Sequence, residues 1–385
     1  MKLEAIQNIE LADIFTHHWN KYNLRNKVNG HIHKVIGAII NCRTSKMGAH
    51  IEKCSNPECN HEVIAYNSCR DRHCPKCCMS KKLKWVAERI HELLPIPYFH
   101  TICTLPPIAH NICFMNQRVC YDLFFKATSF AINAFSGDPR FLGAQLGFVG
   151  ILHTWGQTLV YHPHIHYIIT GGGIKNGKWI RLPYQHKFLF PVEAMSKIIR
   201  QQFVKLLIKA YDDDKLVFKG KIEYLKDRNH FDRFCKELGN QTWYCYTKPP
   251  FANALKVIEY MGRYTHRVAI SNQRLISLKD GKVKFWYKDY KDNEKRKIMT
   301  LPVDTFIQRF LYHILPKGFR KIRHFGFLNA GFRANRIQLI REQISEKLNS
   351  IEKEIRNWFK EMDIYLNPRC PECKVGYLEF YLNSS

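Results

Sequence analysis

Three histidines alternate with other residues in the segment His162-Pro163-His164-Ile165-His166. Residues 159–170 around them are rich in apolar and aromatic side chains, which predicts a strand. Because side chains two apart in a strand project from the same face, all three imidazoles should share one face, with Ile165 and Tyr167 on the other. Three histidines on one strand face are expensive to bury without a ligand, so the pattern favours a metal site over satisfied core histidines.

We expect His164 and His166 to be metal ligands, with either His162 or His153 as the third. His153 ends a preceding predicted strand, and the sequence leaves the choice between His162 and His153 open. A site that activates a phosphodiester would use Mg²⁺ or Mn²⁺ as a Lewis acid on a phosphate oxygen, which requires an open coordination position.

Two tyrosines, Tyr260 and Tyr264, lie four residues apart in a predicted helix over residues 253–264. This spacing places both side chains on one helix face, from which both could reach one phosphate. Tyrosine has a pKa near 10 and needs a nearby cation to act as a nucleophile at neutral pH. Two aromatics at this spacing are by themselves more often core packing, and the histidine strand is what favours catalysis. Four residues close in sequence supply charge and are candidate DNA contacts: Lys248, Arg263, His266 and Arg267.

Six of the 14 cysteines crowd into residues 54–78. Cys54-x4-Cys59 and Cys74-x2-Cys77 have the spacing of two zinc knuckles, and together they predict one structural Zn²⁺ in a zinc-ribbon module. Cys69 is an alternative ligand, and the remaining candidates are Cys78, His61 and His73. The alternative is a set of reduced, buried cysteines. A closed thiolate site has no position for substrate, so its expected role is to hold a small DNA-facing module together.

A further knuckle, Cys370-Pro371-Glu372-Cys373, has no visible mate near it in the sequence. It either binds zinc with ligands from elsewhere in the chain or is inert.

The charge balance predicts an anionic partner. Lys and Arg number 60 against 33 Asp and Glu, a formal charge of +27 in 385 residues. Phosphate backbones are the natural partners of such a surface, and anionic lipid is the competing option. Apolar runs such as Val35–Ile40 are too short to span a bilayer, and the first residues lack a signal-peptide pattern. We therefore expect a cytoplasmic protein, associated with the nucleoid when active, with DNA and no membrane as its partner.

The elements expected to position these residues mix helices and strands, which predicts an α+β fold of two or three modules. Residues 9–41 should be helical, and Gly171–Gly173 should form a loop that ends the histidine strand. Asp280-Gly281 is typical of a hairpin turn. The remaining expected elements are strands over 99–105, 146–153, 159–170, 243–246, 268–271, 275–278 and 283–287, and a helix over 114–135.

Beyond Thr305 the pattern is again helical. Ile337, Ile340 and Ile344 begin a coiled-coil-like seam that continues to Trp358, and we favour packing on its own chain over pairing of two chains, although an oligomer is possible. Residues 317–336 interleave basic and aromatic side chains, which fits either a single-strand-binding groove or a solvated helix face over a core. The expected domains are 1–95, helical and zinc-binding; 96–304, carrying the histidines and tyrosines; and 305–385, helical and basic with the terminal CPxC.

Taken together, four motifs resemble the rolling-circle transposases of the HUH class (His, hydrophobic, His), of the IS-ninety-one and ISCR insertion-sequence type. The likeness covers nearly the whole chain. The motifs are residues 67–77 (NSCRDRHCPKC), 153–166 with the histidine strand, 260–272 (YMGRYTHRVAISN) and 309–327 (RFLYHILPKGFRKIRHFGF).

The resemblance implies an antiparallel-sheet HUH nuclease domain, with an N-terminal helical and zinc-ribbon module and a C-terminal helical region. It also implies the activity: a transposase that nicks and rejoins single-stranded DNA at the ends of its element and at the target. A tyrosine attacks the phosphate, leaving a 5′-phosphotyrosine link and a free 3′-hydroxyl. Tyr260 and Tyr264 are both candidates, without a claim that they are equivalent.

Two other functions fit parts of the pattern. A plasmid replication initiator or relaxase would share the metal and tyrosine chemistry and act on different DNA. A zinc-dependent DNA-binding regulator would lack catalysis, against which the intact histidine pair and both tyrosines argue.

Overall fold

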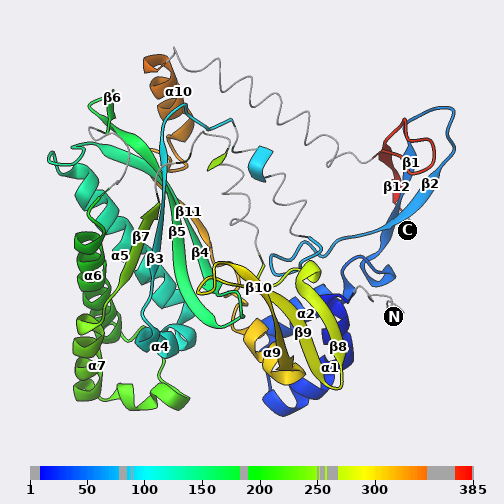
Figure 1. Cartoon of the computed structure of the whole chain (residues 1–385), viewed down its shortest axis with the longest axis horizontal. Helices are drawn as coiled ribbons and strands as arrows, with labels where there is room; N and C mark the ends of the chain where they lie inside the picture. Colours follow the sequence, from blue (N-terminus) through cyan, green and yellow to red (C-terminus); the bar gives the residue numbers. More distant parts are fainter. Residues whose placement is uncertain are drawn as a thin grey trace.

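The computed structural model describes residues 9–77, 85–87, 89, 91–182, 190–248, 251, 256–257, 268–344 and 369–383. Helices combine with three antiparallel sheets in this part of the chain, which confirms the expected α+β class. Figure 1 shows a large sheet backed by helices, a second sheet packed with the N-terminal helices, and a small third sheet in which β1 and β2 are joined by β12 near the C-terminus.

The largest sheet positions the histidines. Its strand order is β11-β4-β5-β3-β7, and β6 pairs with β5. The strands expected over 99–105, 146–153, 159–170 and 243–246 are all confirmed. The bounds are β3 Tyr98–Thr104, β4 Gln145–Trp155, β5 Tyr161–Lys175, β6 Lys178–Arg181, β7 Tyr244–Lys248 and β11 Ile322–Gly326.

The loop expected at Gly171–Gly173 is wrong, because β5 runs through these glycines to Lys175. Neighbouring backbone approaches them closely. A Cβ on Gly171 would lie 2.9 Å from the Pro97 carbonyl oxygen, and one on Gly173 would lie 2.6 Å from that of Gln145. The glycines therefore serve close packing inside the sheet rather than a bend.

Helices cover one face of this sheet (Figure 1). They form the main core with the odd-numbered residues of β5, and Tyr167 in that core bonds the Thr128 hydroxyl at 2.6 Å. The expected helix over 114–135 is interrupted at Asn116, whose side chain bonds the Val217 backbone amide and carbonyl. The elements of this layer are η2 Pro107–Ala109, α4 His110–Met115, α5 Gln117–Gly137, α6 Val192–Asp212, η3 Gly220–Lys226 and α7 Arg228–Asn240.

A second core joins the N-terminal helices to residues 269–314. The helical segment expected over 9–41 is split, because Lys27 adopts a left-handed conformation and Asn29 caps the next helix through the Ile32 amide. The turn at Asp280-Gly281 is confirmed, with both residues at positive φ. The elements are α1 Leu11–Asn26, α2 Gly30–Asn41, η4 Asn272–Arg274, β8 Leu275–Lys279, β9 Lys282–Asp289, β10 Lys295–Pro302 and α9 Val303–Leu311.

The strand expected over 268–271 is wrong: Val268, Ala269 and Ile270 are buried but form no ladder. Burial of an irregular segment produces the same short apolar run as a strand, so composition alone does not separate the two.

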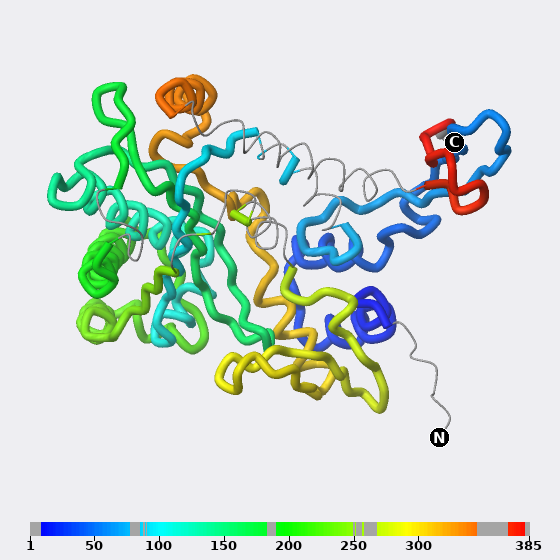
Figure 2. Tube along the Cα trace, turned by 45° about the horizontal axis from the view of Figure 1, so that its top comes forward, coloured from blue at the N-terminus to red at the C-terminus, as the bar shows by residue number. Residues whose placement is uncertain are grey.

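The third sheet, ordered β12-β1-β2, joins residues 49–66 to residues 378–383 near the C-terminus. β1 Ala49–Cys54 lies between β2 Glu62–Tyr66 and β12 Leu378–Asn383, and a short helix, η1 Ser45–Met47, precedes it. Figure 2 shows the C-terminal segment, in red, lying against the blue N-terminal strands and far from the helices of the largest sheet.

The segment beyond Thr305 is less helical than expected. It supplies α10 Arg333–Gln343, but also β11 at the edge of the largest sheet and β12 in the third sheet. Both strands find their partners more than 150 residues earlier in the chain, in β4 and β1, and such distant pairing leaves no local signal in the sequence.

Ile337, Ile340 and Ile344 pack on Leu94 and Phe327 of the same chain, as expected; the rest of the seam lies outside the described residues. No helix of the described part of the chain combines the length and apolar character needed to cross a bilayer.

Candidate metal centre and cysteine clusters

His153, His164 and His166 meet on the face of the largest sheet opposite the helical layer, where His153 and His166 are buried and His164 is half-buried. His153 on β4 lies directly opposite His164 on β5, and Ile151 lies opposite His166. One ring nitrogen from each of the three histidines lies within 4.8 Å of the others. The register of β4 against β5 therefore supplies the third member of the group from the neighbouring strand.

His162 does not join this group, although it shares the strand face. Its ring centroid lies 5.3 Å from that of His164, and its carbonyl oxygen accepts a hydrogen bond from His164 Nδ1 at 2.7 Å. A carbonyl can only accept, so Nδ1 of His164 carries a proton and Nε2 is left with a lone pair for a ligand. Of the two candidates for the third ligand, the geometry brings His153 and not His162 to the cluster.

His100 on β3 is a part of the site that sequence reasoning missed. Its Nε2 lies 3.0 Å from His166 Nδ1, and the two rings stack with centroids 5.2 Å apart. Burial, followed by the charges of Lys248 and His164, lowers the pKa of His100 to about 3, so the ring is neutral and can accept a hydrogen bond. The available signal was a histidine inside the predicted strand 99–105, whose pairing with β5 the sequence did not reveal.

The opposite sides of the same strands build the core. Ile165 and Tyr167 alternate with the histidines and are fully buried among the helices, as expected. The histidine positions are thus fixed by a rigid strand whose other face is tightly packed, which is the usual way in which a site is held to a defined geometry.

An edge of polar aromatic residues flanks the histidines. In the ladder between β3 and β7, Tyr244, Tyr246 and Lys248 lie directly opposite Thr104, Ile102 and His100, so they share the histidine face. Tyr244 is 69% exposed and Tyr246 is 56% exposed. Lys248, expected as a DNA contact, is exposed beside the site; the two tyrosines were not expected.

Tyr260, Tyr264, Arg263, His266 and Arg267 lie outside the described residues.

The residues on either side of this stretch are described. Val257 is buried in an apolar cluster with Val149 and Ile151 of β4. Ala269 and Ile270 are buried in the cluster that contains Trp155 of the same strand. His153 lies between Ile151 and Trp155 along this face of β4, so Val257 and Ala269 pack on the two sides of this histidine.

Eight of the described cysteines form two clusters of four, in place of the single site expected from Cys54, Cys59, Cys74 and Cys77. In the first cluster Cys74 and Cys77 meet Cys69, the alternative ligand, and Cys42 at the end of α2, with all four Sγ atoms within 4.8 Å of one another. Cys42 and Cys69 approach Cys77 at 3.4 and 3.6 Å. Four thiolates around zinc at the usual bond length of about 2.3 Å lie about 3.8 Å apart, so these distances fit a tetrahedral zinc site.

Cys54 and Cys59 belong to the second cluster, with Cys370 and Cys373. The expected grouping failed because it paired knuckles by closeness in sequence, whereas the fold pairs each with a partner from another element. The knuckle Cys370–Cys373 does have partner cysteines, which lie far away in the sequence: Cys59 and Cys370 are 311 residues apart. His61 and His73 belong to neither cluster, and Cys78 lies outside the described residues.

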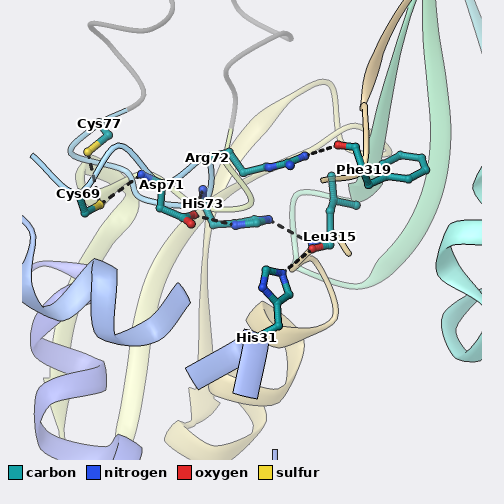
Figure 3. A network of polar contacts seen from close by, with 8 residues as sticks. All are labelled: His31, Cys69, Asp71, Arg72, His73, Cys77, Leu315 and Phe319. Atoms are coloured by element: carbon teal, nitrogen blue, oxygen red, sulfur yellow. Dashed lines mark hydrogen bonds and ion pairs between the residues drawn. The ribbon is translucent and has the colours of Figure 1, made fainter. Parts of the chain in front are cut away.

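The loop between Cys69 and Cys74 docks on residues 315–319, as Figure 3 shows. His73 bonds Asp71 at 2.9 Å through Nδ1 and accepts from the Leu315 amide at 3.2 Å through Nε2, while Arg72 donates to the Phe319 carbonyl at 2.6 Å. His31 of α2 bonds the Leu315 carbonyl at 3.0 Å. The first cysteine cluster thus fixes the loop that connects the N-terminal module to the body of the protein.

The basic and aromatic residues of 317–336 are divided between buried contacts and the surface, where Phe332 is 66% exposed and Arg336 lies over its ring. Phe319 and Phe327 are buried in cores, and Arg323 stacks on Phe125 at 4.2 Å and pairs with Asp122. Arg333 pairs with Glu92 at 3.0 Å. Arg323 and Arg333 thus make contacts between elements. The segment is not one continuous helix face, because it contains β11 before α10 begins at Arg333.

Comparison with known proteins identifies two regions. A family described as "Putative transposase" matches residues 147–336, and one described as "Transposase zinc-binding domain" matches residues 14–105. No solved structure matches the chain.

Two curated relatives are similar along most of their length. One, named "Putative transposase y4qJ", from Sinorhizobium fredii, is 39% identical over 377 residues, covering 96% of this chain and 94% of the relative. The other, named "Transposase for insertion sequence element IS801", from Pseudomonas savastanoi pv. phaseolicola, is 28% identical over 309 residues, covering 79% and 70%. The chain belongs to the insertion-sequence transposases of the IS-ninety-one type, with their zinc-binding domain.

Proposed function

We propose that this transposase nicks and rejoins single-stranded DNA at the histidine face of its largest sheet, through a tyrosine nucleophile and a divalent metal, and so mobilises its element by a rolling-circle mechanism. The observation that carries the proposal is the grouping of His153, His164 and His166, whose ring nitrogens lie within 4.8 Å of one another. A transposase needs a site for phosphodiester chemistry, and among the described residues this is the only all-histidine cluster.

The three histidines fit a metal that keeps positions open for substrate. Three protein ligands leave room for a phosphate oxygen, unlike the closed four-cysteine clusters. Of the expected ions, Mn²⁺ suits imidazole ligands better than Mg²⁺, which prefers oxygen. When bound, the ion would supply Lewis-acid stabilisation of negative charge on the phosphate and on the phenolate.

The protein's own contribution is to orient the ligands. His164 is held by the His162 carbonyl, and His166 faces Nε2 of His100 at 3.0 Å. If His166 binds the metal through Nε2, its Nδ1–H donates to neutral His100, which fixes the tautomer and the ring plane. We assign His100 as a positioning residue, because it would act through His166.

Tyr260 and Tyr264 are the proposed nucleophiles. The anchoring of Val257 and Ala269 on either side of His153 supports a position of the intervening residues over the histidine face. The tyrosine oxygen would form a bond to phosphorus while the bond from phosphorus to the 3′-oxygen breaks. The phenol proton is lost to solvent and the 3′-oxygen gains one, leaving a 5′-phosphotyrosine and a free 3′-hydroxyl. Attack by a 3′-hydroxyl on the phosphotyrosine reverses the step and rejoins the strand.

Tyr244, Tyr246 and Lys248 are proposed to hold the strand beside the site. Exposed aromatic rings next to a cation suit single-stranded DNA, because every base can stack and every phosphate carries charge. Arg263, His266 and Arg267 remain proposed DNA contacts from the sequence, and the formal charge of +27 supports binding of a long stretch of phosphates.

The test is covalent trapping. Zinc-loaded protein is incubated with Mn²⁺ and single-stranded oligonucleotides that carry the element's ends, labelled at either terminus, and separated on a denaturing gel. We expect an adduct that retains the label 3′ of the nick, disappears on removal of Mn²⁺ and is absent from the Tyr260→Phe/Tyr264→Phe variant. An adduct that survives both changes contradicts the mechanism, and DNA binding without any adduct supports a non-catalytic regulator instead.

A further inference from the structure

The second cysteine cluster lies where β1, in the N-terminal part of the chain, pairs with β12 near the C-terminus. Cys54 ends β1 and Cys59 follows it, whereas Cys370 and Cys373 precede β12. The Cys54 and Cys373 Sγ atoms are 3.6 Å apart, and those of Cys59 and Cys370 are 3.9 Å apart. All four thiols are free rather than joined in disulfides.

These distances match a metal site and not a redox pair. A disulfide would bring two sulfurs to about 2.05 Å. A tetrahedral Zn²⁺ with sulfur bonds of about 2.3 Å holds its four sulfurs about 3.8 Å apart. The observed separations lie on either side of that value.

The backbone around the sulfurs has the arrangement of two facing knuckles. The Asn56 amide donates to Cys54 Sγ and the Gly376 amide donates to Cys373 Sγ, each at 3.4 Å. Such bonds stabilise thiolates that share a positive ion.

Glycine is required at position 376. A Cβ there would lie 2.5 Å from Cys54 Sγ and 2.7 Å from the Asn56 amide nitrogen. One knuckle therefore presses directly against the other, and the chain is shaped for this contact.

The two segments that carry the cysteines are also joined by strand pairing. β12 pairs with β1 from His50 opposite Asn383 to Cys54 opposite Leu378. Ser55 and Tyr377 exchange two further hydrogen bonds, at 2.8 and 2.9 Å.

The core beneath this sheet is small. It consists of Cys54, Cys59 and Cys370, with Cys373 and Leu378 packed at its margin. Four of these five residues are the cysteines themselves, so burial of apolar side chains contributes little to holding the C-terminal segment in place. Small modules of this kind usually depend on a metal for their stability.

We propose that Cys54, Cys59, Cys370 and Cys373 bind a second structural Zn²⁺, and that this ion fastens the C-terminal end of the chain to the N-terminal zinc-binding module. The zinc-binding family match ends at residue 105, so half of these ligands lie outside it. The module is then complete only after residues 370–383 have been made. This inference does not depend on the proposed nuclease chemistry.

The test counts thiolate-bound metals in the full-length protein. Cobalt is substituted for zinc in a His164→Ala/His166→Ala background, which excludes the histidine site, and sulfur-to-cobalt charge-transfer absorption is measured with the metal content. We expect two cobalt ions per chain, and one after the further change Cys370→Ser/Cys373→Ser. Cys245→Ser is the matched control, because Cys245 contacts Cys103 and belongs to neither cluster; it should keep both ions. A count of one before the Cys370→Ser/Cys373→Ser change, or two after it, overturns the proposal.

A second measurement needs no variant, in case the double substitution prevents folding. Zinc-loaded wild-type protein is treated with iodoacetamide, and labelled cysteines are mapped by mass spectrometry before and after chelation. Cys373 is half-buried rather than fully enclosed, so its protection depends on the metal. We expect Cys373 to be protected with zinc and to become labelled together with Cys54 on chelation. Labelling of Cys373 in the zinc-loaded protein contradicts the site.

Discussion

Replacing His100 tests whether this residue supports metal binding through its hydrogen bond to His166. His100→Phe keeps a buried ring of similar shape but removes the acceptor for His166 Nδ1, which now lies 3.0 Å away. Loss of such an outer partner typically weakens metal binding by about 10–100-fold, or about 1.4–2.7 kcal/mol. An independent estimate agrees, because a buried donor that loses its acceptor costs about 1–3 kcal/mol.

The assay is a titration of zinc-loaded protein with Mn²⁺. Binding is measured by calorimetry or from the electron paramagnetic resonance signal of the free Mn²⁺. His100→Gln is the matched variant, because its side-chain oxygen can accept a hydrogen bond, and we expect it to recover part of the affinity. In the trapping reaction, His100→Phe should raise the Mn²⁺ concentration needed for half-maximal adduct formation while leaving the yield at saturating Mn²⁺ close to normal.

The reasoning is refuted if folded His100→Phe binds Mn²⁺ with unchanged affinity. Equal losses in the Phe and Gln variants would also contradict it, because they would show that packing and not the hydrogen bond is responsible.

Three further predictions concern DNA binding and stability. Tyr244→Ala and Tyr246→Ala should each weaken single-stranded DNA binding by about 1–3 kcal/mol, measured by fluorescence anisotropy, without changing its salt dependence; a change in the salt slope instead would argue against stacking. Lys248→Ala should reduce the magnitude of that slope, d log K/d log[salt], by about 0.7, and an unchanged slope would exclude a phosphate contact. Burial lowers the pKa of His313 to about 4, so the folded state favours the neutral ring. The contribution of this ring to the free energy of unfolding is complete above the ordinary pKa of 6.5 and is lost as pH falls towards 4. At pH 5 this loss should be about 2 kcal/mol relative to pH 7; urea unfolding of His313→Gln should lack this component, and equal acid sensitivity in both proteins would contradict the assignment.

Local periodicity predicted most of the strands that carry the site. Alternation of apolar residues in β4 and β5 placed the histidines on one face and Ile165 and Tyr167 in the core, and both features are found. Which histidine completes the group depends on the register between β4 and β5. Register is set by cross-strand packing, which a single strand's sequence does not encode.

The cysteine clusters show the same limit more strongly. The knuckle spacing identified metal-binding residues correctly as a type, but Cys42 and Cys370 come from elements remote in sequence from the ligands they join. Cys42 at the end of α2 also looks like an ordinary buried helix residue. Partners of this kind become apparent only when the fold has brought these distant elements together.

The most direct measurement of the central claim is the position of the covalent link to DNA. Trapped adduct from wild-type protein is digested with nuclease and trypsin, and nucleotide-modified peptides are sequenced by mass spectrometry. We predict a phosphodiester on tyrosine in the peptide of residues 257–263 or that of residues 264–267, which hold Tyr260 and Tyr264. A link to any residue outside these two peptides would contradict the account.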